Sequence, residues 1–346
     1  MELDGRWVDL SGTQGGGGGR RRLLAVVLLP LLLAAAWGLW LGLYAVSPGP
    51  AEEESLVYIP PGSPFPAIER HLVEAGILRA DRRFRWLAVL SGQRQQLKAG
   101  EYAVSAGASP REVLALLVAG RTVRRQITIP EGANLFQVAE LLAAQKLLDA
   151  PDFIAFATDP ATPARFGLDS PTLEGWLFPD TYYFTRGQRR DEVTRVMVER
   201  ARRVLAELLA TRGNDTGLNE LELMTLASIV EKETGLASER TLIAGVFYNR
   251  LERRMRLQTD PTVIYGLQSF DRRLTRVDLR EPTPYNTYLI FGLPPGPIAN
   301  PGRESIAAVL RPAETDYLYF VSRNDGSHQF STNLRDHNRA VQRYQR

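Results

Sequence analysis

The stretch Leu23–Val46, LLAVVLLPLLLAAAWGLWLGLYAV, decides how the rest of this chain must be organised. It has 24 residues and no charged side chain. A helix of that length covers about 36 Å, which exceeds the roughly 30 Å of hydrocarbon in a bilayer. Pro30 is tolerated inside a membrane-spanning helix, and Trp37, Trp40 and Tyr44 lie where an aromatic belt is expected. We therefore predict a single transmembrane helix over residues 23–46.

The charges on either side of this helix predict its orientation. Arg20–Arg22 precede it and Glu52–Glu54 follow it. The positive-inside rule then places residues 1–22 in the cytoplasm as a tail and everything after residue 46 in the periplasm or outside the cell. A cleaved signal peptide would have an apolar region of only about 7–15 residues. We therefore expect an uncleaved, single-pass anchor in the inner (plasma) membrane.

The composition of the whole chain excludes several functional classes. The 346 residues are enough for two domains, and 44% hydrophobic with 23% charged residues is typical of globular folds. A net charge of +3 does not indicate a dedicated nucleic-acid binder. The absence of cysteine rules out disulfides and thiolate nucleophiles. The three histidines, His71, His328 and His337, are far apart in the sequence, so we expect no metal site.

Residues 47–122 are expected to form a linker and a small α+β module. The segment 47–55 is rich in proline and acidic residues, as linkers are. Strand-like and helix-like segments then alternate over about 65 residues, which suggests a compact unit. The expected elements are a strand at 57–60, helices at 65–75 and after Asp81, a strand at 99–104, and a helix opened by Ser109 and Pro110.

Residues 123–346 are expected to form a larger α+β domain. It begins with a strand at 126–129, and helices are predicted at 135–145, 189–209, 219–234 and 238–255. The proline-rich segment 150–190 is predicted to be mostly loop. The remainder is expected to mix short strands with polar loops.

Four stretches of this second domain combine aromatic rings with amide and carboxyl side chains. This mixture is typical of a carbohydrate groove, where rings stack on sugar faces and amides bond hydroxyl and acetamido groups. Because the chain lacks cysteine, a histidine cluster and a glycine-rich phosphate loop, a carboxyl group is the best remaining acid–base catalyst. The alternative is that the rings belong to the core and the prolines punctuate loops. The stretches are 173–182, 227–234, 257–266, and 284–288 with 292–298 and 300–301.

The helix expected at 219–234 carries two carboxyl groups near its end. At 100° per residue, Glu231 falls on one flank of the apolar face and Glu233 on the other. A carboxyl beside apolar groups is desolvated, which favours its neutral, proton-donating form. The helical wheel does not choose between the two, and either could be an ordinary solvated glutamate.

The runs ASIVEKET at 227–234 and LQTDPTVIYG at 257–266 resemble the endolytic murein transglycosylase family, which has a YceG-like domain. Further similarities occur in family order over roughly residues 123–340. They lie at 173–182, 237–240, 246–251, 284–288, 293–298, 317–321 and 330–334. The resemblance implies a cytoplasmic tail, one transmembrane helix, a LysM-like module within residues 47–122, and a catalytic domain over residues 123–346.

The same resemblance implies a lytic transglycosylase that cleaves peptidoglycan glycan strands without a metal or cofactor. It assigns Glu231 as the acid that protonates the oxygen between N-acetylmuramic acid and N-acetylglucosamine. The Glu231 carboxylate would then take the proton of the C6 hydroxyl, which closes a 1,6-anhydro ring. Endolytic cutting of nascent strands and cell-wall synthases as partners are also implied by the family. Residues expected to contact the glycan are Glu174, Gln258, Asp260, Tyr285 and Asn286.

Two other functions fit the same residues. A glycoside hydrolase would need a second carboxylate, about 5–5.5 Å or about 6.5–9.5 Å from the first, and Asp260 or Glu174 could supply it. A non-catalytic wall-binding or scaffold protein would need no acid at position 231.

Overall fold

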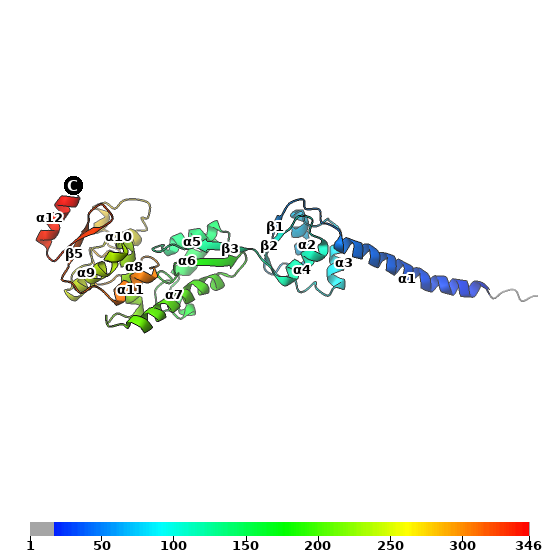
Figure 1. Ribbon diagram of the computed structural model, residues 1–346, viewed down its shortest axis with the longest axis horizontal. Coiled ribbons are helices and arrows are strands. Elements are labelled where there is room, and N and C mark those ends of the chain that lie inside the picture. The colour runs from blue at the N-terminus through cyan, green and yellow to red at the C-terminus, as the bar shows by residue number, and fades with distance from the viewer. Residues whose placement is uncertain (1–16, 346) are drawn as a thin grey trace, which may run out of the picture. The chain divides into compact units, whose positions relative to one another are not determined.

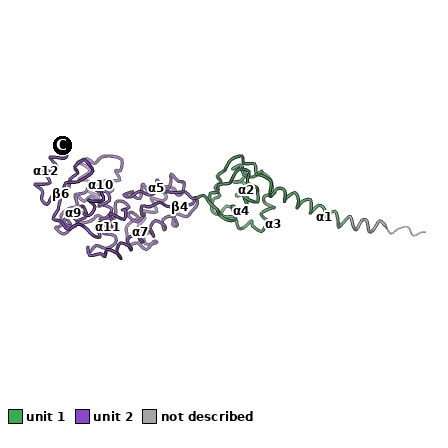
Figure 2. The backbone as a smooth tube through the Cα atoms, viewed as in Figure 1, with its two compact units in different colours: residues 1–123 green, residues 124–346 purple. Residues whose placement is uncertain are grey.

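The computed structural model describes residues 17–345, with side chains from residue 26 onward (Figure 1). The chain divides into two compact units, residues 1–123 and 124–346 (Figure 2). Residues 1–16 of the expected cytoplasmic tail lie outside the described residues. Helices alternate with short antiparallel strand pairs in both units, which is the mixed α+β architecture that the sequence predicts.

Helix α1 (Gly17–Val46) contains the apolar stretch Leu23–Val46 that was predicted to span the membrane. Its segment Val26–Val46 has 21 residues and is long and apolar enough to cross a membrane. The helix begins six residues before Leu23, so residues 17–22 of the expected tail are helical. Near its C-terminal end, Leu41 and Tyr44 are buried in the core of the first unit.

The rest of the first unit is built in the order strand, helix, helix, strand. Strand β1 (Ser55–Ile59) pairs antiparallel with β2 (Gly100–Val104). Helices α2 (Phe65–Glu74) and α3 (Arg83–Leu90) lie between them in the sequence, and α4 (Pro110–Ala119) follows. The first turn of α4 is fixed by a capping box, in which the Ser109 hydroxyl and the Glu112 carboxylate each accept the other's backbone N–H.

The second unit opens with a strand pair whose partners are far apart in the sequence. Strand β3 (Arg124–Thr128) pairs antiparallel with β4 (Thr181–Thr185), and alternate residues of β4 are buried. Helices α5 (Leu135–Ala144) and α6 (Ala150–Thr158) lie between them in the sequence and pack against each other.

The segment 150–190 is therefore less loop-rich than the sequence analysis expected. Pro151 lies in the first turn of α6, where a missing N–H costs nothing, and the Asp149 side chain caps that turn. Only the short 3-10 helix η1 (Pro163–Phe166) and the connections around it match the expected irregular structure.

The helical body of the second unit is centred on α8 (Glu220–Glu233). It packs against α9 (Arg240–Glu252), α10 (Asp260–Gly266) and α11 (Arg303–Leu310), and α11 also contacts the long helix α7 (Arg190–Arg212). Every α8 residue from 223 to 230 is buried because neighbours cover the helix on all sides. The charged residues 231–233 follow where the helix leaves this core.

The C-terminal part holds helices that the sequence analysis did not predict. Strands β5 (Tyr319–Ser322) and β6 (His328–Ser331) form an antiparallel pair, and α12 (Leu334–Tyr344) packs on both. Helices α10, α11 and α12 replace much of the expected polar loop, and α10 and α11 are too short to show a clear apolar period. Two 3-10 turns, η2 (Ala237–Glu239) and η3 (Asp278–Arg280), complete the described elements.

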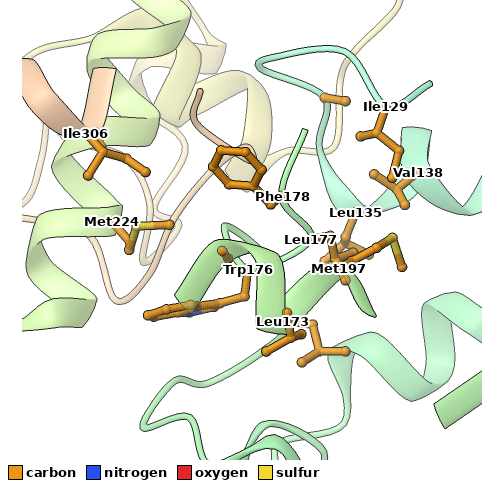
Figure 3. Packing of buried hydrophobic residues seen from close by; sticks show 14 of the residues in the cluster. Ile129, Leu135, Val138, Leu173, Trp176, Leu177, Phe178, Met197, Met224 and Ile306 are labelled. Carbon is orange, nitrogen blue, oxygen red and sulfur yellow. The ribbon is translucent and has the colours of Figure 1, made fainter. Parts of the chain in front are cut away.

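One buried connection fixes the centre of the second unit. Leu173, Trp176 and Phe178 precede β4 and belong to the same apolar core as Met197 of α7, Met224 of α8 and Ile306 of α11 (Figure 3). This core holds the backbone of residues 173–178 in place and with it the polar Glu174.

Candidate active site

The charged end of α8 carries the two glutamates between which the sequence could not choose. Both Glu231 and Glu233 are partly exposed, and Lys232 between them is exposed. Thr234 is already extended, so the helix ends directly after Glu233. The two carboxyl groups meet different partners.

Glu231 lies at the start of another helix. Its Oε2 accepts a hydrogen bond from the Gly302 N–H at 2.9 Å, and Gly302 is the N-cap residue of α11. The positive end of a helix dipole stabilises a negative charge placed there. The site can therefore hold the carboxylate that remains after Glu231 has given up a proton.

A second carboxyl group, Glu131, meets Glu231 at Gly302. A Cβ atom at Gly302 would overlap the Glu131 carboxyl, so this carboxyl lies directly against the glycine that binds Glu231. Arg240 Nη2 lies 3.9 Å from the other Glu131 oxygen, and the Glu131 side chain is 52% exposed. Partial burial and the neighbouring Glu231 both raise the pKa of Glu131.

Sequence reasoning did not single out Glu131. Its only local signal is its place in the turn Pro130-Glu131-Gly132 directly after β3. Gly132 has φ +73°, a conformation that favours glycine, and its N–H donates to the Asn300 carbonyl at 2.9 Å. The Lys232 ammonium donates to the Gly132 carbonyl at 3.2 Å. These contacts join the turn to α8 and to the segment before α11.

Glu174 lies behind this turn and is fully buried. Its oxygens accept the Leu135 N–H at 3.1 and 2.9 Å, and Asn300 Nδ2 donates to Oε1 at 3.3 Å. Burial raises the pKa of Glu174 to about 8, although hydrogen bonds from Leu135 and Tyr265 act in the opposite direction. Because its carboxyl has no exposed surface, it contacts protein groups and not solvent.

Glu233 faces the opposite side of α8. The Thr259 hydroxyl donates to Glu233 Oε1. Burial of the carboxyl raises its pKa to about 7 and Asp260 adds to the shift, whereas Thr259, His328 and Arg250 lower the pKa. Glu233 thus connects the end of α8 to the loop that leads into α10.

The expected site residues Gln258 and Asp260 lie on this loop with exposed side chains. Gln258 has φ +49°, and its N–H donates to the Thr287 carbonyl at 3.1 Å. The Tyr288 hydroxyl donates to Asp260 Oδ1 at 2.7 Å. Residues 258–260 and 287–288 therefore pack together beside Glu233, with Thr259 and Thr287 buried and Gln258 and Asp260 exposed.

Tyr285 and Asn286 differ in exposure although they are adjacent. Tyr285 is partly exposed, and its ring lies 4.9 Å from the ring of Tyr265. Asn286 is fully buried, and its Nδ2 donates to the carbonyls of Leu279 and Glu281 at 3.2 and 2.8 Å. Asn286 therefore braces its own loop.

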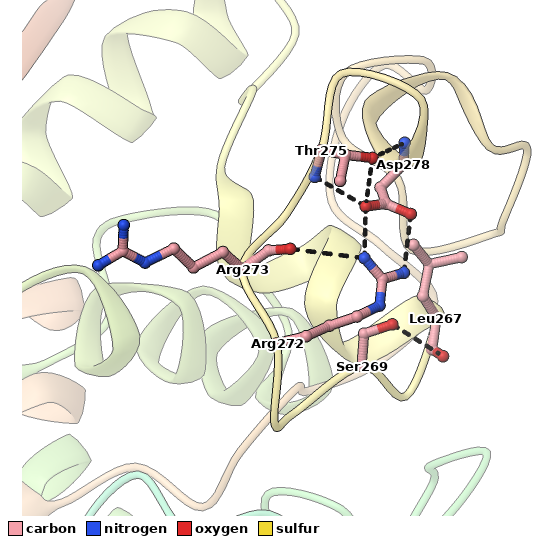
Figure 4. Close-up of polar contacts among 6 residues, drawn as sticks. All are labelled: Leu267, Ser269, Arg272, Arg273, Thr275 and Asp278. Carbon is pink, nitrogen blue, oxygen red and sulfur yellow. Dashed lines mark hydrogen bonds and ion pairs between the residues drawn. The ribbon is translucent and has the colours of Figure 1, made fainter.

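That loop is also closed by an ion pair (Figure 4). The Arg272 guanidinium donates to both carboxylate oxygens of Asp278 at 2.7 and 2.8 Å, and the Thr275 N–H donates to Asp278 Oδ2 at 2.7 Å. Hydrogen bonding to Arg272 lowers the pKa of Asp278. The ion pair fixes the path of the chain between α10 and Tyr285.

The arrangement offers proton transfer as its chemistry. Glu231 is partly exposed, has a second carboxyl beside it and a backbone donor to stabilise its ionised form. No group of three or more His, Asp or Glu side chains able to hold a metal ion occurs among the residues that the structure describes.

Comparisons with known proteins agree on one family. A model of the YceG-like family matches residues 57–343. An endolytic murein transglycosylase of Bacillus subtilis (strain 168) is 32% identical over 315 residues, which cover 85% of this chain and 87% of the relative. An endolytic murein transglycosylase of Streptococcus pneumoniae serotype 2 (strain D39) is 31% identical over 317 residues, which cover 82% of this chain and 57% of the relative.

A solved structure has the same fold. The 2.6 Å crystal structure of a YceG-like protein from Listeria monocytogenes matches with a TM-score of 0.58 and 33% sequence identity. The match covers 84% of this chain and 100% of the Listeria chain.

Proposed function

This chain belongs to the YceG-like family, and from that premise we propose that it is a membrane-anchored endolytic lytic transglycosylase of peptidoglycan. Its relatives are endolytic murein transglycosylases by name, which supports the reaction class. The observation that carries the proposal is the partly exposed Glu231 at the N-terminus of α11 with Glu131 beside it.

In the proposed mechanism Glu231 acts first as an acid and then as a base. It protonates the oxygen between N-acetylmuramic acid and N-acetylglucosamine, and the C1–O bond of the muramyl sugar breaks. The Gly302 N–H and the α11 dipole stabilise the carboxylate that results. This carboxylate then takes the proton from the C6 hydroxyl of the same sugar, and the C6 oxygen bonds to C1. The 1,6-anhydro ring closes without water.

Glu131 supplies a second negative charge to this step. Partial burial raises the pKa of Glu131, and so does the neighbouring Glu231. The muramyl C1 becomes positive at the transition state, and a carboxylate near it is stabilising. We assign Glu131 to this electrostatic role.

The other expected site residues divide by exposure. Gln258, Asp260 and Tyr285 remain proposed glycan contacts because their side chains reach the surface. Glu174 and Asn286 are fully enclosed, so we propose that they position the backbone around the site and do not touch sugar. Glu174 would act through Asn300, whose side-chain amide donates a hydrogen bond to the Glu174 carboxyl.

The remaining assignments concern the membrane anchor and the small module of the first unit. We propose that Val26–Val46 spans the inner membrane with the N-terminus in the cytoplasm. Residues 124–346 would then work in the periplasm or outside the cell. Residues 47–122, which contain β1, α2, α3, β2 and α4, are proposed as the linker and LysM-like module. Action near the membrane, where new strands are made, would bring the enzyme close to cell-wall synthases.

Product analysis tests the proposed function. The full chain in detergent is incubated with purified glycan strands, and the new ends are identified by mass spectrometry, with Glu231→Gln as the control. Anhydro-muramyl ends that arise from cuts inside the strands support the proposal. New reducing ends would indicate a hydrolase that uses the Glu131–Glu231 pair, and wall binding without cleavage would indicate a scaffold.

A further inference from the structure

Helix α3 presents an apolar face that its own unit does not cover. Trp86, Val89 and Leu90 are 46%, 41% and 60% exposed. Trp86 and Leu90 are one turn apart and share a face of the helix. Arg82 is exposed one turn before Trp86. The face therefore combines an aromatic ring, two aliphatic side chains and a cation.

This face continues directly from the apolar helix α1. The rings of Trp37 and Trp86 meet edge to face, with centroids 5.8 Å apart. The Arg83 guanidinium lies over the ring of Tyr44, 4.3 Å from its centroid. Leu41 is buried in the core that also contains Phe84 of α3. Helix α3 thus packs along the last part of α1, and the depth of α1 in a membrane sets the depth of α3.

The length of α1 determines that depth. A hydrocarbon core of about 30 Å needs about 20 helical residues. If the span ended before Trp37, the apolar helix from Leu23 would cover only about 21 Å. The span must therefore include Trp37 to cross the bilayer, and Trp86 touches Trp37.

We propose that the α3 face of Trp86, Val89 and Leu90 lies in the outer leaflet of the membrane that α1 spans. The inference rests on the proposed anchor. Tryptophan is favoured at the boundary of headgroups and hydrocarbon, and an exposed cation such as Arg82 is placed to meet lipid phosphates. The first unit is then held on the membrane surface by two helices, α1 through the bilayer and α3 at its outer boundary.

Single cysteines can test this placement because the native chain contains none. Leu90→Cys reports the proposed face. Leu56→Cys on β1 is the matched control, since Leu56 is 58% exposed and carries the same side chain. Leu33→Cys marks the interior of α1. Each full-length variant is nitroxide-labelled and reconstituted into phosphatidylethanolamine–phosphatidylglycerol vesicles, and spin relaxation by oxygen and by a water-soluble nickel chelate is measured.

The ratio of oxygen to nickel relaxation should be several-fold higher at positions 33 and 90 than at position 56. A position 90 that matches position 56, while position 33 stays in hydrocarbon, overturns the inference and leaves the anchor intact. A position 33 exposed to nickel overturns the anchor itself and the inference with it.

Discussion

The two flanks of the α8 terminus differ although their glutamates are only two residues apart. Residues at that spacing point about 200° apart around a helix. Glu231 meets a backbone N–H, a helix N-terminus and the exposed carboxyl of Glu131. Glu233 meets the Thr259 hydroxyl, with Asp260 and Arg250 among its charged neighbours. We propose that the Glu231 flank exchanges protons with the glycan, whereas the Glu233 flank braces a loop.

Under the proposed mechanism, a shifted pKa does not by itself identify the catalytic group. The pKa of Glu233 is raised to about 7, which is the range expected for a general acid. Its carboxyl, however, connects α8 to Thr259 within the protein. The partners of each carboxyl are therefore the better guide to its role.

The largest expected effect comes from Glu231→Gln. Glutamine keeps the volume and helical preference of glutamate but cannot give or take a proton. Loss of general acid–base catalysis should lower kcat by about 10²–10⁴-fold or more. Circular dichroism and thermal unfolding should match the native enzyme, which separates a chemical defect from a folding defect. A soluble, folded variant with native kcat would show that the acid lies elsewhere.

Glu131→Gln should have the next largest effect. It removes a negative charge near the reacting sugar, so kcat should fall by roughly 10–100-fold, below the loss expected from the acid itself. The loss should be largest above the raised pKa of Glu131, where the native carboxyl is charged. The measurement is kcat against pH. An unchanged profile would separate Glu131 from the reaction.

Gly302→Ala tests whether the position of the Glu131 carboxyl beside Glu231 matters for activity. Gly302 has φ −73°, which alanine adopts freely, but its methyl group would occupy the space of the Glu131 carboxyl. The carboxyl should swing away, and activity should fall about as far as in Glu131→Gln. The double variant should lose little more than either single variant. Fully additive losses would mean that the two residues act independently.

Glu233→Gln is expected to change catalysis least. Its main effect should appear in the pH dependence of the free energy of unfolding. The folded protein keeps a proton on Glu233 up to about pH 7, whereas an unfolded chain loses it near pH 4.5. The native free energy of unfolding therefore falls as pH rises through this window, by up to about 1.4 kcal/mol per pH unit from this group. Glutamine removes that contribution and still accepts from Thr259.

The check for Glu233→Gln is denaturant unfolding at several pH values between 4.5 and 7. The variant's free energy of unfolding should decline less steeply with pH than the native one. Parallel curves would mean that Glu233 keeps an ordinary affinity for protons.

Local sequence signals were sufficient for some of this structure. Asn219 and Glu222 form the capping box that begins α8, and helical periodicity placed Glu231 and Glu233 on different flanks. The long apolar segment of α1 could also be predicted from the sequence. These features depend on neighbours within a few residues.

Other features depend on contacts between distant segments, which a single sequence does not display. Glu131 meets Glu231 only because Asn300 joins the turn after β3 to the start of α11. Glu174 and Asn286 looked like groove residues because they sit among aromatic rings. Their burial follows from the packing of α5, α10 and the loop before α11, and local composition cannot distinguish an internal polar brace from an exposed one.

The most direct test places Glu231→Gln and Glu233→Gln in the same digest of purified glycan strands, at matched concentrations and with folding verified for both. Release of 1,6-anhydro-muramyl ends is followed over time. We predict that Glu233→Gln produces these ends at a rate close to that of the native enzyme and that Glu231→Gln produces almost none. An active Glu231→Gln beside an inactive Glu233→Gln would contradict the account, because the catalytic carboxyl would then lie on the other flank of α8.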